Sequence, residues 1–422
     1  MKKIIPFIMC VFLFLVTINV DTVYACTNET MNFNYNGKIF TYSLIDNIKS
    51  SNQFDLNYEI NKYNRFSTQI NRIKLLEHLN SIGIEKKIAL EYLFPNLSKT
   101  IKKIEKNIYI RPKNASLKID PNSQRVFSIT PEIVGINLDK NTLIEQIFNS
   151  YINAKPLNFS IPTTKIYPSK TKEDLTKFTN LRSDFSTNIA SSSKDRKHNI
   201  KNALMSLNKI EIYPNEIFSF NKIVGKRTKE NGYREAKIIV NNEFVDGIGG
   251  GVCQVSTTLY NAALLAGLEI VESNKHSKQI SYVKSGFDAM VNFGSSDLKF
   301  KNNTNQKLTI ITNYNNNYAR IRIFGENMNN TTYKLSNEII NVVEPNEEIL
   351  FDENKEHLEK VKFEDEFFYL KNPSKGMEIK TYREKYENNH LISKELLRHD
   401  KFKVQNGIKI FGTEKKSHKI EV

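Results

Sequence analysis

Hydrophobic and polar residues recur with different periods along the chain, and each period predicts a different element. Residues 33–44 alternate around Asn36-Gly37, a dipeptide favoured in two-residue hairpin turns, and predict a β-hairpin. The stretch 56–108 repeats Leu and Ile at helical spacing among Lys and Glu, and predicts two or three amphipathic helices. Residues 26–106 are therefore expected to mix a hairpin with helices.

The pattern then changes to strand, strand, helix, strand. Strands are predicted at 108–117 and 127–135, a helix near 140–153 and a strand near 157–161. This order is typical of a small α+β domain, here over residues 107–175.

The rest of the chain is richer in strands and turns. A helix predicted at 199–207 opens a central region at 180–326. Residues 330–422 are charged and turn-rich, and 376–382 with 391–395 alternate as a β-hairpin does. The predicted fold class is α+β and multidomain, with a β-rich C-terminal module.

The first 25 residues have the three parts of a secretory signal peptide. Two lysines precede an apolar run that ends at Val20, and Ala25 supplies the small residue that a signal peptidase requires. Cleavage after Ala25 would release the chain, lipidation of Cys26 would tether it, and an uncleaved anchor is the third alternative. Tyr24 is bulky for a lipidation motif and favours release. Each route predicts an exported protein.

The net charge of +15 indicates an anionic partner. Export argues against nucleic acid and favours peptidoglycan carboxylates or other anionic wall polymers. The alternative is that the lysines only keep the surface soluble.

The cysteines do not form a disulfide framework. Cys10 is lost with the signal segment, which leaves only Cys26 and Cys253. The role of the interior thiol of Cys253 is therefore the question that the cysteine count raises.

Cys253 lies in the most informative stretch of the chain, residues 247–267. Four glycines within five positions indicate a backbone that turns tightly or closely approaches another group. From Val255 to Ala266 apolar residues follow helical spacing, and Gly267 suits the helix C-terminus. Cys253 is therefore predicted at the helix N-terminus, or one residue before it.

A thiol in that position has a chemical consequence. Free N–H groups and the helix dipole stabilise an anion there, which favours a reactive thiolate. His276 and Asp288 follow near successive predicted strands, at 268–272, 280–283 and 290–293. We predict Cys253 as nucleophile, His276 as base and Asp288 as the acid that orients the imidazole, with Asp297 as the rival acid. The alternative is that Cys253 is a small core residue.

The glycine-rich loop is also a candidate binding site. Its predicted ligand-binding residues are Gly249, Gly250, Gly251, Gln254 and Ser256. The loop lacks the Lys-Ser/Thr of a nucleotide P-loop, and no paired metal-ligand spacing occurs. We predict no cofactor and no metal.

The central region closely resembles the VanW domain. The matching residues are 196–200, 217–221, 224–228, 232–233, 236, 247–267, 276–277, 282–283, 286–289 and 297–302. Lys284-Ser285 stand where the family usually has a Pro-rich turn. Residues 107–175 resemble the peptidoglycan-binding domain often found ahead of VanW domains, and 376–413 resemble a degenerate form of the wall-associated G-five module. The resemblance implies a Gram-positive cell envelope and an association with glycopeptide resistance, but no reaction.

Two functions remain open. The order Cys, His, Asp is similar to that of transglutaminase-like cysteine enzymes, which would make Cys253 the nucleophile of an amide hydrolase or acyl transferase acting on wall peptides. The modular build instead favours a non-catalytic peptidoglycan-binding protein of the envelope, in which the loop and Cys253 only shape a groove.

Overall fold

The computed structural model describes residues 30–44, 69–240 and 243–415. The predicted signal peptide and Cys26 lie outside these ranges. The chain divides into two compact units, Met1–Ala115 with Pro131–Thr171, and Ser116–Thr130 with Lys172–Val422. Each unit has its own apolar core, as a chain of this length requires.

The first unit contains the predicted hairpin. Strands β1 (Thr30–Tyr35) and β2 (Lys38–Ser43) pair antiparallel, and Asn36 and Gly37 both have positive φ, as the tightest hairpin turns require. Strand β6 (Asn158–Ser160) pairs parallel to β1. The prediction for 33–44 is confirmed.

Helices pack on this small sheet in the first unit. Helices α2, α3 and α4 cover Gln69–Ser81, Lys86–Leu93 and Leu97–Ile108, and α5 covers Lys140–Ile152. Their buried Leu and Ile residues form one cluster with Phe33 and Phe159 of the sheet. The helices predicted at 56–108 and 140–153 are confirmed within the described residues. Strands β5 (Gly135–Leu138) and β7 (Thr163–Ile166) pair beside them.

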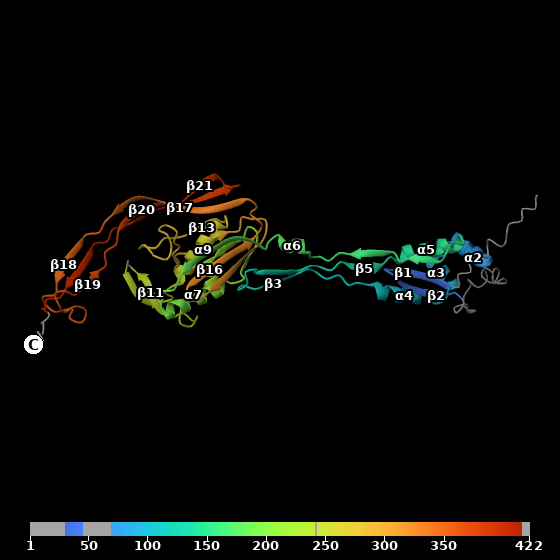
Figure 1. Cartoon of the computed structure of the whole chain (residues 1–422), viewed down its shortest axis with the longest axis horizontal. Coiled ribbons are helices and arrows are strands. Elements are labelled where there is room, and N and C mark those ends of the chain that lie inside the picture. The colour runs from blue at the N-terminus through green and yellow to red at the C-terminus, as the bar shows by residue number, and fades with distance from the viewer. Residues whose placement is uncertain (1–29, 45–68, 241–242, 416–422) are drawn as a thin grey trace, which may run out of the picture. The chain divides into compact units, whose positions relative to one another are not determined.

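The second unit is built on a four-stranded antiparallel sheet. Its order is β8-β16-β15-β9, with bounds Asn180–Asn188, Tyr318–Gly325, Leu308–Tyr314 and Glu211–Ile212. Helices α7 (Lys194–Leu207) and α9 (Val252–Leu265) pack against this sheet and against each other, so both lie on one face (Figure 1). The core of the unit lies between these helices and the sheet.

Shorter elements surround this core. A three-stranded sheet has the order β10-β14-β13, from Ile217–Ser219, Lys299–Lys301 and Glu269–Glu272. The two-stranded pieces are β11 (Glu235–Val240) with β12 (Glu243–Ile248), and β3 (Ser116–Ile119) with β4 (Phe127–Thr130). The short helices α6 and α8 span Lys172–Thr176 and Phe220–Val224.

The C-terminal part of the second unit is entirely β in the described residues. One sheet has the order β17-β20-β21, from Thr331–Val343, Gly376–Glu387 and His390–Phe402. The other has the order β18-β22-β19, from Glu347–Phe351, Gly407–Phe411 and Phe367–Lys371. The hairpin predicted at 376–395 is confirmed, and the fold is α+β and multidomain.

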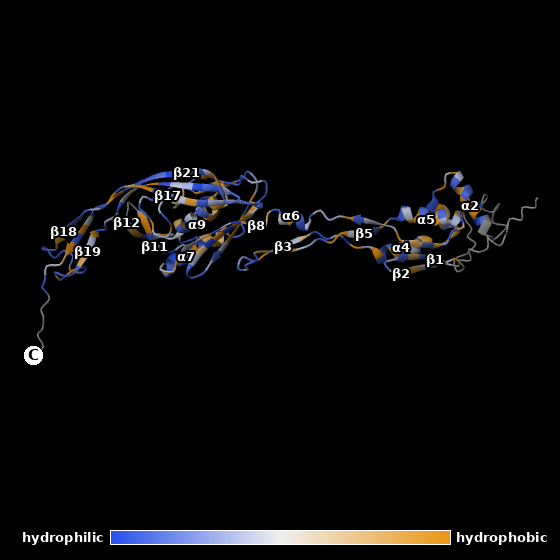
Figure 2. Cartoon of the chain, turned by 45° about the horizontal axis from the view of Figure 1, so that its top comes forward, coloured by the Kyte–Doolittle hydropathy of each residue, from blue (hydrophilic) through white to orange (hydrophobic). Residues whose placement is uncertain are grey.

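Polar and apolar residues are mixed along the helices (Figure 2). Within the described ranges, no helix combines the length and the apolar character that crossing a membrane requires.

Candidate active site at the start of helix α9

Helix α9 begins as the sequence predicts. Its N-cap is Gly251, with φ of +109°, and Cys253 is the second residue of the helix. The predicted apolar positions from Val255 to Ala266 are buried, and Gly267 follows with φ of +74°. In this first turn the N–H groups of Val252 and Gln254 donate to the carbonyls of Gly249 and Gly251, and Cys253 lies between them at the positive end of the helix dipole.

Close approaches explain the glycines before the helix. A Cβ on Gly249 would lie 2.7 Å from Cβ of Arg227, and a Cβ on Gly250 would lie 2.6 Å from the carbonyl oxygen of Ala236. A Cβ on Gly251 would lie 3.0 Å from Cγ of Arg196. The prediction of close backbone approach is confirmed, and the groups approached are strand β11 and two arginines.

His276 and Asp288 form a buried pair beside the thiol. Nδ1 of His276 lies 2.7 Å from Oδ2 of Asp288, which also accepts the backbone N–H of His276 at 2.6 Å. Their side chains are 6% and 4% exposed. The imidazole also interacts electrostatically with the thiol of Cys253, and that thiol lies 3.4 Å from the carbonyl oxygen of Val291. The structure therefore brings the three predicted residues together in the order thiol, imidazole, carboxylate.

The pKa values of these groups shift in the directions that favour a thiolate–imidazolium ion pair. Burial raises the pKa of the Cys253 thiol, but the hydrogen bond and charge of His276 outweigh burial and leave that pKa lowered. For His276, burial lowers the pKa, yet the bonds to Asp288 and Cys253 raise it to about 9. Burial opposes ionisation of Asp288, and His276 and Arg398 lower its pKa overall. A thiolate–imidazolium pair is thus favoured near neutral pH.

Asp297, the rival acid, has other partners. Its carboxylate accepts the hydroxyl of Ser219 and the backbone N–H groups of Asn221 and Leu298. It therefore holds β10 and the start of α8, and Asp288 is the carboxylate bonded to His276.

The segment after β13 differs from the prediction. The strand at 268–272 is confirmed as β13, whereas the strands predicted at 280–283 and 290–293 are wrong. Residues 290–293 form only two isolated bridges, from Met290 to Asn274 and from Asn292 to Ser296. The physical reason is that residues 287–291 bond to helix α9 instead of to a strand.

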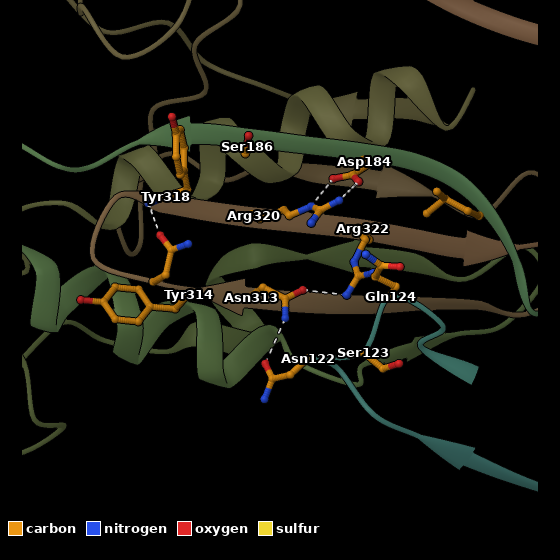
Figure 3. Close-up of a pocket in the computed structure, with 12 residues that line it drawn as sticks. Asn122, Ser123, Gln124, Asp184, Ser186, Asn313, Tyr314, Tyr318, Arg320 and Arg322 are labelled. Carbon is orange, nitrogen blue, oxygen red and sulfur yellow. Dashed lines mark hydrogen bonds and ion pairs between the residues drawn. The ribbon is translucent and has the colours of Figure 1, made fainter. Parts of the chain in front are cut away.

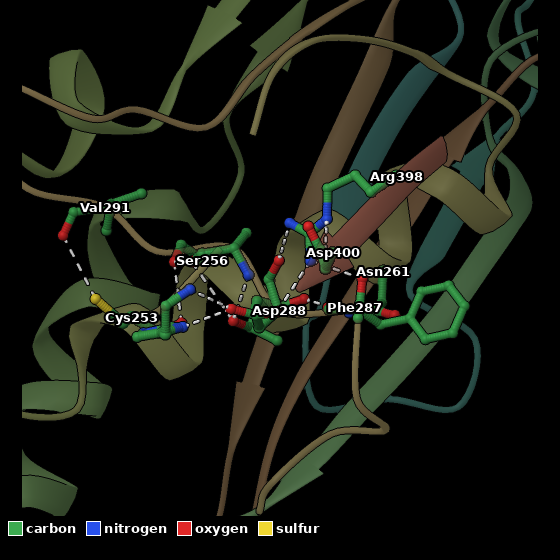
Figure 4. A network of polar contacts seen from close by, with 12 residues as sticks. Cys253, Ser256, Asn261, Phe287, Asp288, Val291, Arg398 and Asp400 are labelled. Carbon is green, nitrogen blue, oxygen red and sulfur yellow. Dashed lines mark hydrogen bonds and ion pairs between the residues drawn. The ribbon is translucent and has the colours of Figure 1, made fainter. Parts of the chain in front are cut away.

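Three side chains four residues apart on α9 make these bonds. Cys253, Thr257 and Asn261 contact the backbone of Val291, Ala289 and Phe287, in that order. Four residues of helix rise about 6 Å and two residues of extended chain span about 6.6 Å. The bonding groups on the helix and on residues 287–291 therefore have matching spacings. Figure 4 shows this network, with Cys253 at one end and Arg398 at the other.

The predicted ligand-binding side chains on the helix are committed to internal bonds. Gln254 donates to the carbonyl of Asn188 at 2.8 Å and accepts from Arg196 at 3.0 Å. Ser256 donates to the carbonyl of Ala289 at 2.5 Å. Both residues are buried. In this conformation they position the loop and the segment 287–291, and the thiol of Cys253 is the partly exposed group beside them.

Sequence reasoning missed the arginines of the site. Arg398 of β21 donates to Oδ1 of Asp288 at 2.9 Å and to the carbonyls of Gly286 and Asp288. Arg196 and Arg227 both interact electrostatically with the thiol of Cys253.

Among the residues that the structure describes, no group of three His, Cys, Asp or Glu side chains is placed to hold a metal ion. A separate hollow of about 870 Å³ lies over β8, β15 and β16 (Figure 3). Its lining is polar and includes Tyr314, Tyr318, Arg322 and the ion pair of Arg320 with Asp184. None of the predicted site residues lines it.

Two family models match the chain. The model described as "VanW like protein" covers residues 195–324, which include Cys253, His276 and Asp288. The model described as "Putative peptidoglycan binding domain" covers residues 37–157. These matches support a cell-wall-associated, extracytoplasmic function.

Individual relatives agree with the first match. The protein YoaR of Bacillus subtilis (strain 168) is 36% identical over 249 residues, 59% of this chain and 77% of YoaR. The vancomycin B-type resistance protein VanW of Enterococcus faecalis (strain ATCC 700802 / V583) is 29% identical over 34% of this chain and 54% of that protein.

Two solved G5 domains, from an IgA1 protease and from HP0197, align with 21% and 19% of this chain and with 98% and 95% of their own chains. The sequence identity is 18% for both, and the TM-scores are 0.13 and 0.12.

The resemblance to the VanW domain is thus confirmed by a family model and by a relative whose length is largely covered. The chain belongs to the VanW-like family.

Proposed function

We propose that this protein is exported to the cell wall, where Cys253 is the nucleophile of an amide hydrolase or acyl transferase acting on wall peptides. In this proposal His276 is the base and Asp288 orients it. Residues 37–157, which match the peptidoglycan-binding model, hold the wall polymer, and residues 180–326 carry the reaction.

The observation that carries the proposal is the position of the His276 imidazole. It interacts electrostatically with the thiol of Cys253, and its Nδ1 lies 2.7 Å from Oδ2 of Asp288. A core cysteine needs no such partner, whereas a nucleophilic cysteine needs a base that is itself oriented by a third group.

The reaction follows from this order. The thiolate attacks the carbonyl carbon of the amide and forms a C–S bond, and the positive end of the α9 dipole stabilises the oxyanion. As the C–N bond breaks, the imidazolium of His276 gives its proton to the leaving amine. Water or a second amine then attacks the thioester and His276 accepts its proton. The C–S bond breaks and the thiolate leaves, which restores the thiolate–imidazolium pair.

The test is the pH dependence of alkylation by iodoacetamide, measured by mass spectrometry on the peptide that contains Cys253. We expect rapid labelling below the ordinary thiol pKa of about 8.5, because His276 stabilises the thiolate. The His276→Ala protein should be labelled slowly at the same pH.

His390→Ala is the matched control, because His390 is exposed at the turn between β20 and β21. Its labelling should equal that of the wild type. Slow labelling of the wild-type protein that only unfolding accelerates would contradict the proposal and identify Cys253 as a core residue.

A second candidate is a non-catalytic wall-binding protein. The match of residues 37–157 to the peptidoglycan-binding model supports it. The first unit also has a hollow of about 610 Å³ beside β1, β2 and β6, lined largely by Asn, Thr and Ser side chains that could bond to a polar polymer.

Sedimentation with purified peptidoglycan separates the two candidates. Both expect the Cys253→Ala protein to bind. Only the catalytic candidate expects the wild type to release amines or to cross-link peptides, with complete loss in Cys253→Ala. Binding without turnover by the wild type would favour the second candidate.

A further inference from the structure

Arg227 presents two buried cationic nitrogens that lack a hydrogen-bond partner. It lies in the loop between α8 and β11, and both Nη1 and Nη2 are closed to solvent without bonding to any residue that the structure describes. The hydroxyl oxygen of Tyr233 is also buried without a hydrogen-bond partner among the described residues. The side chains of Arg227 and Tyr233 interact electrostatically.

These donors lie beside the reactive thiol. The stem of Arg227 packs on Gly249, four residues before Cys253, and its guanidinium carbon lies 5.6 Å from the ring centroid of Phe220. Arg227 and Cys253 interact electrostatically. Cys253 itself is half-buried.

An unpaired guanidinium in this position needs an anion. Arginine does not lose its proton in proteins, and a buried charge without a partner strongly destabilises the fold. Asp297 is a carboxylate that interacts electrostatically with Arg227, but it already accepts three hydrogen bonds, from Ser219, Asn221 and Leu298. Arg196, the other arginine near the thiol, donates to Gln254.

We infer that Arg227, with the hydroxyl of Tyr233, binds a carboxylate of the peptide whose amide Cys253 attacks. A guanidinium fork matches a carboxylate in two parallel hydrogen bonds, and a tyrosine hydroxyl supplies a third donor. The substrate class is therefore a peptide with a free carboxylate near the scissile amide. The inference rests on the proposed function for the reaction, but the binding step stands independently of it.

The experiment measures binding without reaction. Cys253→Ser protein is titrated with N-acetyl-alanyl-alanine and with its C-terminal amide, with Arg227 intact or as Arg227→Gln. We expect the acid to bind at least about tenfold more tightly than the amide, as charge-assisted hydrogen bonds allow, and Arg227→Gln to abolish the preference.

Arg234→Gln is the control for net charge, because the guanidinium of Arg234 pairs with Asp195 at the surface. It should keep the preference for the acid. Equal binding of acid and amide, or a preference that survives Arg227→Gln, would overturn the inference. Failure of the acid to bind at millimolar concentration would overturn it as well.

A second measurement needs no variant at Arg227, in case that protein does not fold. The wild-type thiol is alkylated by iodoacetate and by iodoacetamide, and each rate is divided by the rate of the same reagent with glutathione. The ratio of the two quotients then cancels the intrinsic reactivities of the thiol and of the reagents. A ratio in favour of iodoacetate supports an anion site, and a ratio in favour of iodoacetamide contradicts it. A thiol inert to both, combined with Arg227-dependent binding of the acid, would end the proposed reaction and leave the binding site intact.

Discussion

Nη2 of Arg398, on strand β21, lies 2.9 Å from Oδ1 of Asp288, the carboxylate that pairs with His276. The two side chains are 12% and 4% exposed. Oδ2 of Asp288 is bonded to His276 and Oδ1 to Arg398, so both oxygens are satisfied and the carboxylate cannot rotate freely. Arg398 lies beyond residues 195–324, so the candidate site extends past the VanW-like match into the C-terminal strands.

Removing Arg398 should therefore weaken both the fold and the site. In Arg398→Ala the buried carboxylate of Asp288 loses one of its two cationic partners, and breaking a buried pair costs about 3 kcal/mol or more. We expect the free energy of unfolding in urea to fall by that amount. We also expect slower alkylation of Cys253, because Asp288 no longer holds the imidazole.

Lys394→Ala is the matched control on the same strand, where Lys394 is 47% exposed and 3.9 Å from Glu384. Surface pairs of this kind contribute about 0.5 kcal/mol, so its stability should barely change. A loss below about 1 kcal/mol in Arg398→Ala would contradict the role given to this residue, because a buried pair should cost more.

The second prediction concerns the protonation of His276. Its pKa is raised to about 9 because Asp288 and Cys253 stabilise the imidazolium against burial. The group therefore stabilises the fold fully below its unfolded pKa of about 6.5, and this contribution is lost as pH rises through about 9. NMR titration of the imidazole should show a proton retained at neutral pH.

The Cys253→Ser protein tests the contribution of the thiolate to this shift. Its hydroxyl is neutral, so the pKa of His276 should fall while the bond to Asp288 keeps the ring in place. His198, whose imidazole bonds to the carbonyl of Gly232, serves as an internal reference in the same spectra. An imidazole of His276 that titrates identically in both proteins would show that the thiol does not stabilise its charge.

Much of this site could be predicted from the sequence because the sequence signals were local. The glycines at 249–251 and the helical spacing after Cys253 predicted the helix start, and His276 and Asp288 were identified by residue type and order. Arg398 was not, because one arginine in an alternating strand resembles a solvent-facing residue until the fold brings it to Asp288, 110 positions earlier.

The prediction of a strand at 290–293 was wrong for a related reason. Its apolar alternation does describe an extended chain, but the partner of Val291 and Ala289 is helix α9 rather than a second strand. Periodicity reports which face of a segment is buried and not which element covers it. The unpaired nitrogens of Arg227 were beyond sequence reasoning for the same reason, since they depend on packing against Gly249 and Phe220.

The last prediction tests the loop that aims Cys253. Gly251 has φ of +109°, and a Cβ there would lie 3.0 Å from Cγ of Arg196 and from Cγ1 of Ile200. Gly294 has a similar φ of +91° but open space around it. Gly251→Ala combines backbone strain with a clash at helix α7, whereas Gly294→Ala has strain alone, of about 1 kcal/mol or more. Gly251→Ala should therefore lose more stability in urea and also slow alkylation of Cys253, because the start of α9 must shift. Equal losses in the two variants, with unchanged alkylation in Gly251→Ala, would show that this loop does not set the position of the thiol.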